Sequence, residues 1–400
     1  MAIIDADAHV VEWERTWEYM GEGERAFAPR VMVFKDQPQE ASGRRRGSEF
    51  WKIGGRVFAK DQNIGFDTPR ETREMEDVKA RLAHMDKLGV DVQVLYPSLF
   101  LRVLTPLPHV DTALCKSYNR WLADIWKAGK GRLRWVVIPP LHYIEKAIEE
   151  LNFGKENGAC GVFIRGVEGD KLPTEPHFFP LYEEASRLGM PICVHASQGN
   201  LDMFDIFGQG ASLAQFKFGP INLFGSLITT GLPQKFPDLR WAFVEVSAEW
   251  IPYVMNHLEI GYRKRGDAWP GREFLKDNHI YVRCQTSDDL PYILEHVGDD
   301  HIVLGTDYGH NDTASEINAL RKLNARKIGV VQLADPPRAP APEDDYLTLS
   351  GFEVVASKGV GSKASELGII LDAALALAAE EARAHLAGEG DFDFDPLGGA

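Results

Sequence analysis

The chain has 400 residues, of which 44% are hydrophobic and 26% charged, a composition typical of a globular protein with one or two domains. Its formal net charge of −15 argues against nucleic acid and anionic membranes as partners, because phosphate groups are bound by clustered Lys and Arg. The sequence contains no run of about 18 uncharged apolar residues, and its four scattered cysteines form no CxxC pair, so neither a membrane span nor a disulfide framework is expected.

Short apolar runs rich in β-branched residues recur along the chain and predict strands. There are eight of them, at residues 3–9, 90–98, 133–140, 160–166, 191–197, 240–247, 279–286 and 301–310. Segments of helical periodicity lie between them, several closing on glycine, at residues 71–89, 112–129, 143–158, 179–189, 249–265, 290–298 and 314–323. Eight strands alternating with helices predict an α/β protein with a closed (β/α)8 TIM barrel. A doubly wound open sheet is the alternative, although no GxGxxG motif follows the first strand.

Two long segments interrupt this alternation, residues 13–70 after the first strand and residues 198–232 after the fifth. Insertions after barrel strands lie at the carboxyl-terminal face, where they build the substrate pocket or a lid. The Phe and Leu content of residues 198–232 predicts an apolar pocket wall, and an oligomer contact is the alternative.

The first predicted strand carries several ionisable residues, in the sequence IIDADAHVVEW at residues 3–13. Side chains alternate between the two faces of a strand, so we expect Asp5, Asp7 and His9 to point the same way. Burying three ionisable groups on one face is unfavourable unless something binds them. A metal ion is one candidate for that role.

Further polar residues stand where other predicted strands end, and a barrel brings these ends to one mouth. They are Arg165, His195, Glu245 and Asp307, beside Asp7 and His9. Imidazoles and carboxylates that converge from separate strands are typical of a metal site, and this mixture suits Zn, Fe or Mn. Taken singly, a buried His can be a satisfied core residue, and Asp307 can be a turn residue. Their joint occurrence at strand ends favours a metal site.

Several stretches within residues 1–325 are similar to a known family. They include DADAHVVE, RLAHMDKLGVDVQVLYPS, SYNRWLADI, PLYEEASRLGMPICVHAS and GTDYGHND. On these motifs the chain resembles the amidohydrolase superfamily, in the amidohydrolase-2 branch that includes aminocarboxymuconate-semialdehyde decarboxylase. The resemblance implies a distorted (β/α)8 barrel, the metal-dependent hydrolase fold, with a divalent metal at its mouth. It matches the family's HxH to Asp7-x-His9, its strand-five His to His195 and its strand-eight Asp to Asp307.

The departures from the family pattern concern the same site. Asp7 replaces the first His of HxH, and Glu245 stands where many relatives carry His. Arg165 ends strand four, so the carbamylated Lys that bridges two metals in other amidohydrolases has no counterpart. Carboxylates in place of imidazoles make the site harder, which favours Fe or Mn over Zn, and carboxylates can bridge a second ion. We therefore expect a divalent metal cofactor, Fe, Mn or Zn, as one ion or two.

Four residues are candidates for additional roles, each with an alternative. Glu12, one turn past the strand, is a candidate ligand or a residue that starts a helix. His310 is a candidate to face the substrate or a second metal, and His177 is either a further candidate or a surface-loop residue. Arg165 is a candidate clamp for a substrate carboxylate through two parallel hydrogen bonds, or forms a structural salt bridge.

The predicted site is compatible with three chemistries. A hydrolase would use metal-bound water, with Asp307 as general base and His310 or His195 polarising the electrophile. A non-oxidative decarboxylase would use the metal to hold a substrate carboxylate or hydroxyl, with Asp307 protonating the ring carbon. We expect one of these two activities, on a small, partly apolar carboxylate-type organic substrate. A non-haem di-iron oxygenase on the same barrel is the alternative, because the site is rich in carboxylates.

The last part of the chain does not match the family pattern. We expect a barrel domain over residues 1–325, with residues 326–400 as an extension. Within it, residues 334–345 predict a Pro-rich linker, residues 365–388 predict an Ala/Leu-rich helix that packs on the barrel or a neighbouring subunit, and the tail is acidic. We expect a homo-oligomer. Because no signal-peptide pattern precedes Ile3, we also expect a cytoplasmic location.

Overall fold

The computed structural model describes residues 3–33, 49–60, 63–65, 67–207, 213–271 and 273–325. Within them, an eight-stranded parallel sheet runs in the order β1-β5-β6-β7-β8-β9-β10-β11. The strands are β1 (Ile4–Val10), β5 (Val92–Pro97), β6 (Leu133–Val137), β7 (Ala159–Ile164), β8 (Ile192–His195), β9 (Trp241–Val244), β10 (Ile280–Cys284) and β11 (Ile302–Leu304). Each of them lies in one of the predicted strand segments or overlaps it.

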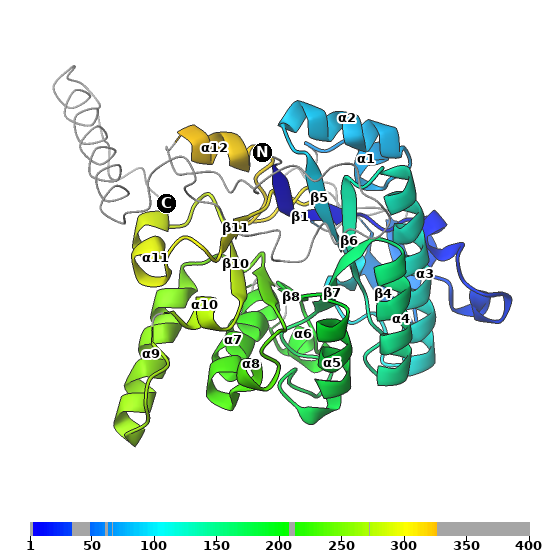
Figure 1. Cartoon of the computed structure of the whole chain (residues 1–400). Helices are drawn as coiled ribbons and strands as arrows, with labels where there is room; N and C mark the ends of the chain where they lie inside the picture. The colour runs from blue at the N-terminus through cyan, green and yellow to red at the C-terminus, as the bar shows by residue number, and fades with distance from the viewer. Residues whose placement is uncertain are drawn as a thin grey trace, which may run out of the picture. The chain divides into compact units, whose positions relative to one another are not determined.

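Hydrogen bonds between the first strand and the segment after the last one close the sheet into a barrel. The His9 amide donates to the Tyr308 carbonyl at 2.9 Å, and the Asp307 amide donates to the Asp7 carbonyl at 2.8 Å. Ala8 and Tyr308 also form a parallel bridge. The prediction of a (β/α)8 barrel is therefore confirmed, with the strands enclosed by helices in Figure 1.

Helices connect the strands in sequence and cover the outside of the barrel (Figure 1). They are α1 (Arg70–Arg73), α2 (Val78–Leu88), α3 (Pro108–Ala128), α4 (Ile144–Glu156), α5 (Phe179–Arg187), α6 (Leu201–Phe207), α7 (Phe218–Thr230), α8 (Leu232–Lys235), α9 (Trp250–Arg265), α10 (Phe274–Asp277), α11 (Leu290–Val297) and α12 (Ala319–Ala325). Barrel strands are covered on both faces, which is why they read as continuous apolar runs in the sequence.

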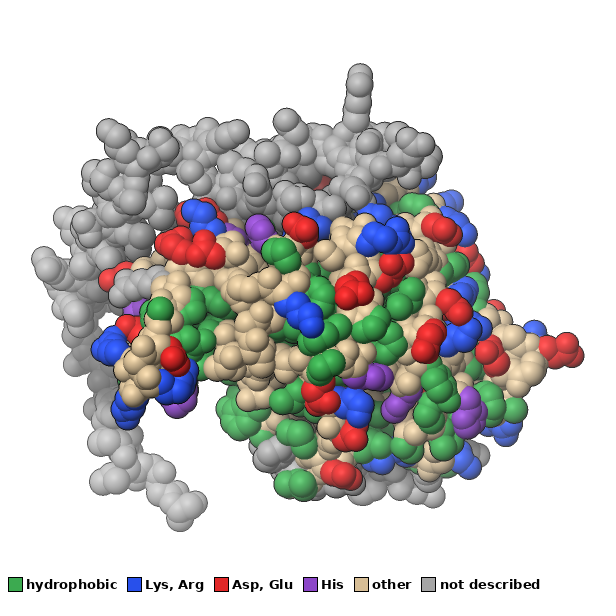
Figure 2. All heavy atoms as spheres, turned by 60° about the horizontal axis from the view of Figure 1, so that its bottom comes forward, with side chains coloured by type: hydrophobic (Ala, Val, Ile, Leu, Met, Phe, Trp, Pro, Cys, Tyr) green, Lys and Arg blue, Asp and Glu red, His purple; other side chains and the backbone are tan. Residues whose placement is uncertain are grey.

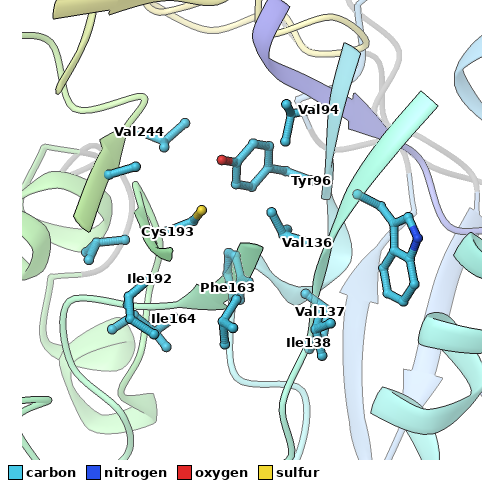
Figure 3. Close-up of a cluster of buried hydrophobic side chains, with 14 of the residues drawn as sticks. Val94, Tyr96, Val136, Val137, Ile138, Phe163, Ile164, Ile192, Cys193 and Val244 are labelled. Carbon is cyan, nitrogen blue, oxygen red and sulfur yellow. The ribbon is translucent and has the colours of Figure 1, made fainter. Parts of the chain in front are cut away.

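Apolar side chains from neighbouring strands fill the core. Val94 and Tyr96 of β5, Val136 of β6, Phe163 of β7 and Cys193 of β8 belong to one buried cluster (Figure 3). All four cysteines of the chain are free and buried, so none of them is paired in a disulfide.

The predicted helix over residues 71–89 is wrong as a single element, because it divides into α1 and α2. Met75, between them, has a φ of 55°, which a helix cannot accommodate. Asp77 then caps α2, its carboxylate accepting hydrogen bonds from the amides of Lys79 and Ala80. Gly89 ends α2 in the left-handed conformation, as its position in the sequence indicated.

The first insertion, residues 13–70, is less irregular than its sequence suggested. It forms an antiparallel sheet of β2 (Arg30–Val33), β3 (Glu49–Ile53) and β4 (Arg56–Ala59), with 3-10 turns at Glu14–Trp17 and Glu22–Phe27. Residues 34–48, 61–62 and 66 of this insertion lie outside the described residues.

The second insertion, residues 198–232, contains α6, a π-helical turn at Leu213–Lys217, α7 and the start of α8. Residues 208–212 lie outside the described residues. The carbonyl of Phe216 accepts a hydrogen bond from the amide of Ser197 at 2.9 Å, directly after β8. This insertion is therefore bonded to the carboxyl-terminal end of a barrel strand.

Residues 326–400, with the predicted linker at 334–345 and the predicted helix at 365–388, lie outside the described residues, so the predicted domain boundary stays a prediction. Across the described ranges, we find no helix of the length and apolar character that crossing a membrane requires. On the face shown in Figure 2, acidic and basic side chains are interspersed among apolar ones.

Candidate metal centre

The ionisable side chains of β1 do not share one role. Asp5 is held by the protein itself, because its carboxylate accepts hydrogen bonds from Gln93 Nε2 at 2.9 Å and from the Thr306 amide and hydroxyl at 2.8 and 2.6 Å. The expectation that Asp5 needs a bound cation is therefore wrong. Asp7 and His9 instead face side chains from other strands.

Six buried side chains from four strand ends meet at the mouth of the barrel: Asp7, His9, His195, Glu245, Asp307 and His310. They form two groups of candidate metal ligands, in each of which the ligand atoms lie within 4.8 Å of one another. One group contains Asp7, His9 and His195, and the other contains His9, Glu245, Asp307 and His310. His9 belongs to both groups, so the two overlap in one site.

Hydrogen bonds of the His9 ring fix which nitrogen is available to a metal. His9 Nδ1 lies 2.8 Å from the carbonyl oxygen of Pro97, an acceptor, so Nδ1 carries the hydrogen. The lone pair on Nε2 then faces Asp7 Oδ1 at 3.4 Å and Asp307 Oδ1 at 3.2 Å. Lone pairs that face each other repel, and a cation between them removes the repulsion.

The same reasoning applies to the other two imidazoles. His195 Nδ1 lies 3.0 Å from the carbonyl oxygen of Ala196, which leaves Nε2 toward the cluster in the neutral ring. The Ser98 hydroxyl donates to the carbonyl of Val10, so at 2.7 Å it accepts from His310 Nε2. His310 Nδ1 therefore faces the cluster, 2.9 Å from Asp307 Oδ1.

Unpaired buried atoms provide a direct test of whether these residues fit a cation. Among the described residues, five buried side-chain atoms of the cluster have no hydrogen-bond partner: Asp7 Oδ2, His9 Nε2, Glu245 Oε2, Asp307 Oδ1 and His310 Nδ1. A buried polar atom without a partner costs free energy. His9 Nε2 and Asp307 Oδ1 face each other at 3.2 Å, so a divalent ion between them can satisfy both, and the residues present fit such an ion.

The backbone at the strand ends is strained at two cluster residues. Glu245 follows β9 with a φ of 63°, and Asp307 follows β11 with a φ of 53°. Non-glycine residues rarely adopt this left-handed region, and such strain tends to be concentrated at functional sites. Both carboxylates are buried members of the cluster.

Electrostatics separate two kinds of group in the cluster. Burial alone would raise the pKa of Asp7, but the Arg283 guanidinium and the neighbouring imidazoles outweigh burial and hold this pKa well below its ordinary range. Burial lowers the pKa of His9 to about 3, and His310 adds to the effect. Asp7 is therefore ionised and His9 is neutral at physiological pH, the forms that bind metal ions.

Glu245 and His310 are instead groups that hold protons. Burial, followed by the charges of Asp312 and Asp307, raises the pKa of Glu245 well above its ordinary range. Burial opposes protonation of His310, but the Asp307 carboxylate outweighs it and raises the pKa. Burial raises the pKa of Asp307 itself to about 6, against the opposing charge of His310.

Arg165 and Glu12 were predicted at this site, and the structure gives both of them other partners. Arg165 pairs with Glu168 at 2.8 Å and donates through Nε and Nη2 to the Phe100 carbonyl, which favours the structural salt bridge over the substrate clamp. Glu12 belongs to neither ligand group among the described residues. Its Oε2 accepts hydrogen bonds from the amides of Ser98 and Leu99, and its Oε1 is buried without a hydrogen-bond partner. The roles of Arg165 as a substrate clamp and of Glu12 as a metal ligand stay predictions.

His177 also lies outside both groups. Its Nε2 contacts the carbonyl oxygen of Leu141 at 3.1 Å, and the side chain is half-buried. The surface-loop alternative is therefore the better description of His177.

Sequence reasoning missed Arg283, which lies on β10 and is 1% exposed. Its Nε is 3.2 Å from Asp7 Oδ2. A single Arg within an apolar strand segment gives no signal of its own, although a buried Arg always requires an acidic or carbonyl partner.

Both insertions contact the mouth. Residues 64–65 pair with the backbone of His310 and Gly309, the Gly65 amide donating to the Gly309 carbonyl at 2.8 Å. Aromatic side chains of the first insertion, Trp17 and Trp51, lie 6.1 Å apart, and Trp17 lies 6.3 Å from Phe100, just after β5. Residues 64–65 therefore lie against the backbone at the mouth, and Trp17 and Trp51 form an aromatic group with Phe100.

Fold and site together define a (β/α)8 barrel with a cation-binding cluster at the carboxyl ends of its strands. The amidohydrolase family model matches residues 4–339 of the chain. The chain therefore belongs to the amidohydrolase family, and the predictions of this family and of an enzyme of its superfamily are confirmed.

Among curated proteins, the chain is similar to 2-amino-3-carboxymuconate-6-semialdehyde decarboxylase of Dictyostelium discoideum, with 23% identity over 248 residues. The match covers 58% of this chain and 66% of that protein, just under two thirds of its length. The comparisons give no support to the oxygenase alternative.

Two solved structures share the fold. An amidohydrolase from Mycobacterium avium subsp. paratuberculosis has a TM-score of 0.65 at 17% identity, covering 81% of this chain and 92% of that one. The 5-carboxyvanillate decarboxylase of Novosphingobium aromaticivorans, complexed with manganese and 4-hydroxy-3-methoxy-5-nitrobenzoic acid, has a TM-score of 0.58 at 19% identity, covering 81% and 90%. At these identities the likeness concerns the fold.

The buried Glu12 carboxyl should make the stability of the protein fall as pH rises. Burial raises its pKa to about 7 from an ordinary 4.5, so the folded chain keeps a proton that the unfolded chain releases. The stabilising contribution is complete below pH 4.5 and is lost as the pH rises through about 7. Glu12→Gln should remove this pH dependence, which changes the free energy of unfolding by at most about 3 kcal/mol. Urea unfolding of both proteins near pH 5 and near pH 8 measures it; identical pH slopes would contradict the prediction.

Proposed function

We propose that the chain is a metal-dependent, non-oxidative decarboxylase of a small aromatic or unsaturated carboxylate. The observation that carries the proposal is the joint presence, in one buried site, of an ionised carboxylate, a neutral imidazole and two groups whose pKa values are raised. The names of the relatives support it, since both the curated relative and one of the similar structures are decarboxylases.

Asp7, His9, His195 and Asp307 would hold the ion. Successive ligand atoms, from His195 Nε2 through Asp7 Oδ1 and His9 Nε2 to Asp307 Oδ1, are 3.2–3.4 Å apart. This is the separation of neighbouring ligands around an ion with bonds of about 2.1 Å. We infer Mn or Fe in preference to Zn, because the set contains two carboxylates. A bound divalent ion supplies positive charge that orients a substrate carboxylate or hydroxyl.

His310 is the proposed proton donor. Ser98 fixes its Nε2, so Nδ1 is the atom that exchanges a proton with the site, beside Asp307. When the bond between the substrate carbon and its carboxylate breaks, CO2 leaves and the electron pair stays on the carbon. That carbon takes the proton from His310, which solvent then reprotonates.

Hydrolysis at the same site is the second candidate activity. The pKa of Asp307, about 6, makes this residue mostly ionised at neutral pH, as a general base for water requires. The family name is compatible with either activity. A cytoplasmic location, a homo-oligomer and the exclusion of nucleic acid and membrane partners remain predictions.

Metal analysis of protein purified without added metal, with an assay of CO2 release from benzoates that carry hydroxyl groups, tests the proposal. We expect bound Mn or Fe and CO2 release that a chelator abolishes and the metal restores. His310→Gln should lower turnover by about 100-fold and leave the metal content unchanged. Hydrolysis of esters or lactones without CO2 release would select the second candidate, and wild-type turnover in His310→Gln would remove His310 as the donor.

A further inference from the structure

Arg283 is a buried cation beside the cluster, held in place from several directions. Its Nη2 donates to the carbonyl of Gly305 at 2.8 Å and to the carbonyl of Ala314 at 3.0 Å. Its Nε forms an ion pair with Asp7 Oδ2 at 3.2 Å. Because β10 and the segment after β11 both fix the guanidinium, its charge cannot move away from Asp7.

The contact with Arg283 gives the two oxygens of Asp7 different environments. Oδ2 faces the guanidinium, whereas Oδ1 faces His195 Nε2 at 3.3 Å and His9 Nε2 at 3.4 Å. An ion between the imidazoles therefore meets one oxygen of Asp7. For Asp7 to bridge two ions with one oxygen each, Oδ2 would have to bind the second ion, and Oδ2 already faces the Arg283 cation.

Asp307 is restricted in a comparable way. Its Oδ2 accepts a hydrogen bond from the Ser315 hydroxyl, whereas Oδ1 faces His9 at 3.2 Å and His310 at 2.9 Å. His9 also has one nitrogen available, because Nδ1 is bonded to the Pro97 carbonyl. The shared member of the two ligand groups can thus serve one ion.

The charges lead to the same conclusion. Asp7 and Arg283 form a buried pair of opposite formal charges. The pair therefore contributes an oxygen ligand to the metal site but almost no net charge. Arg283 also interacts with the charges of Asp307 and Glu245, so its field acts on every carboxylate of the cluster. A second divalent ion on the Asp7 side would approach this fixed cation and be repelled.

We propose that Asp7 and Arg283 act as one unit. The guanidinium occupies Oδ2, so that Asp7 binds the ion through Oδ1 alone, and its positive charge offsets the negative charge of the carboxylate and excludes a second divalent ion. The proposal rests on the metal centre described under the proposed function. It assigns Arg283 as a positioning residue and predicts one ion per chain.

A double-mutant cycle with Mn²⁺ as the probe tests the unit, with ion count and Kd measured by calorimetry and elemental analysis. The wild type should bind one Mn²⁺. Asp7→Asn leaves Arg283 unpaired beside the ion and should weaken binding by about 100-fold. Arg283→Met frees the second oxygen and the full charge of Asp7, and should bind a second Mn²⁺ or bind the first at least about tenfold more tightly. The double variant should recover most of the affinity that Asp7→Asn loses.

Two further variants keep the test decisive if Arg283→Met does not fold. Arg283→Lys keeps the charge and should still bind one ion. Arg165→Met removes another buried guanidinium, paired with Glu168 away from the cluster, and should lower stability without changing the Mn²⁺ count or Kd.

The outcomes separate this inference from the proposed function. Equal losses in Asp7→Asn and the double variant, or two ions in the wild type, would overturn the unit and leave the metal centre standing. A wild type that binds none of Mn²⁺, Fe²⁺ and Zn²⁺ would overturn the proposed function itself.

Discussion

Replacing His9 with alanine should abolish metal binding and lower turnover by roughly a thousand-fold, or about 4 kcal/mol of transition-state stabilisation. His9 is the residue common to both ligand groups, and its Nε2 lies within 3.4 Å of carboxylate oxygens from β1 and from the segment after β11. Without it, these oxygens have no imidazole between them. Elemental analysis and CO2 release measure the two effects.

His177→Ala is the matched control for His9→Ala, because it removes an imidazole whose Nε2 contacts the Leu141 carbonyl outside the cluster. It should retain the metal content and turnover of the wild type. Chelation followed by Mn²⁺ should restore the wild type but not His9→Ala. A His9→Ala protein with normal metal content would show that the proposed centre is wrong.

Gly305→Ala should be among the most destabilising substitutions in the barrel. A Cβ at position 305 would lie 2.3 Å from Asp7 Cβ and 2.8 Å from the Asp7 amide nitrogen, closer than any real contact allows. The backbone of β1 fixes the positions of both atoms, so relief requires moving β1 away from the segment after β11. We expect a loss of about 3 kcal/mol or more in the free energy of unfolding, measured in urea.

Gly225→Ala is the control for this substitution. Position 225 lies within α7, and the nearest atom to an added Cβ is Val254 Cγ1 at 3.9 Å, an ordinary contact. Alanine there should be neutral or stabilise the helix by up to about 1 kcal/mol. Similar stabilities of the two variants would contradict the steric argument for Gly305.

The barrel could be predicted because its strands are buried on both faces and therefore stand out as apolar runs. The break between α1 and α2 could not, since it depends on the left-handed conformation of Met75, a residue type that gives no turn signal. The sheet in residues 13–70 was missed because its strands are short and partly exposed, and their alternation is weak.

The candidate site could be predicted from the rule that strand ends meet at one mouth. This rule alone predicts that Asp7, His195 and Asp307 lie close together. The partners of each side chain could not be deduced in the same way. Arg165 and Arg283 both lie in or next to buried strands, yet one pairs with Glu168 in its own loop and the other with Asp7 on β1. Pairing of this kind depends on rotamer and register.

The hydrogen bonds that close the barrel have a consequence for how the protein is made. They join the backbones of Asp7 and His9 to those of Asp307 and Tyr308, and Asp7, His9 and Asp307 are also proposed ligands of the ion. An ion held by Asp7, His9 and Asp307 links the first strand of the barrel, which leaves the ribosome earliest, to the segment after the last strand, which leaves it latest. Closing so long a loop carries an entropic cost, and the binding energy of the ion offsets part of it. Metal loading should therefore follow release of the last strand from the ribosome. A chain that has incorporated the ion is one whose barrel has closed.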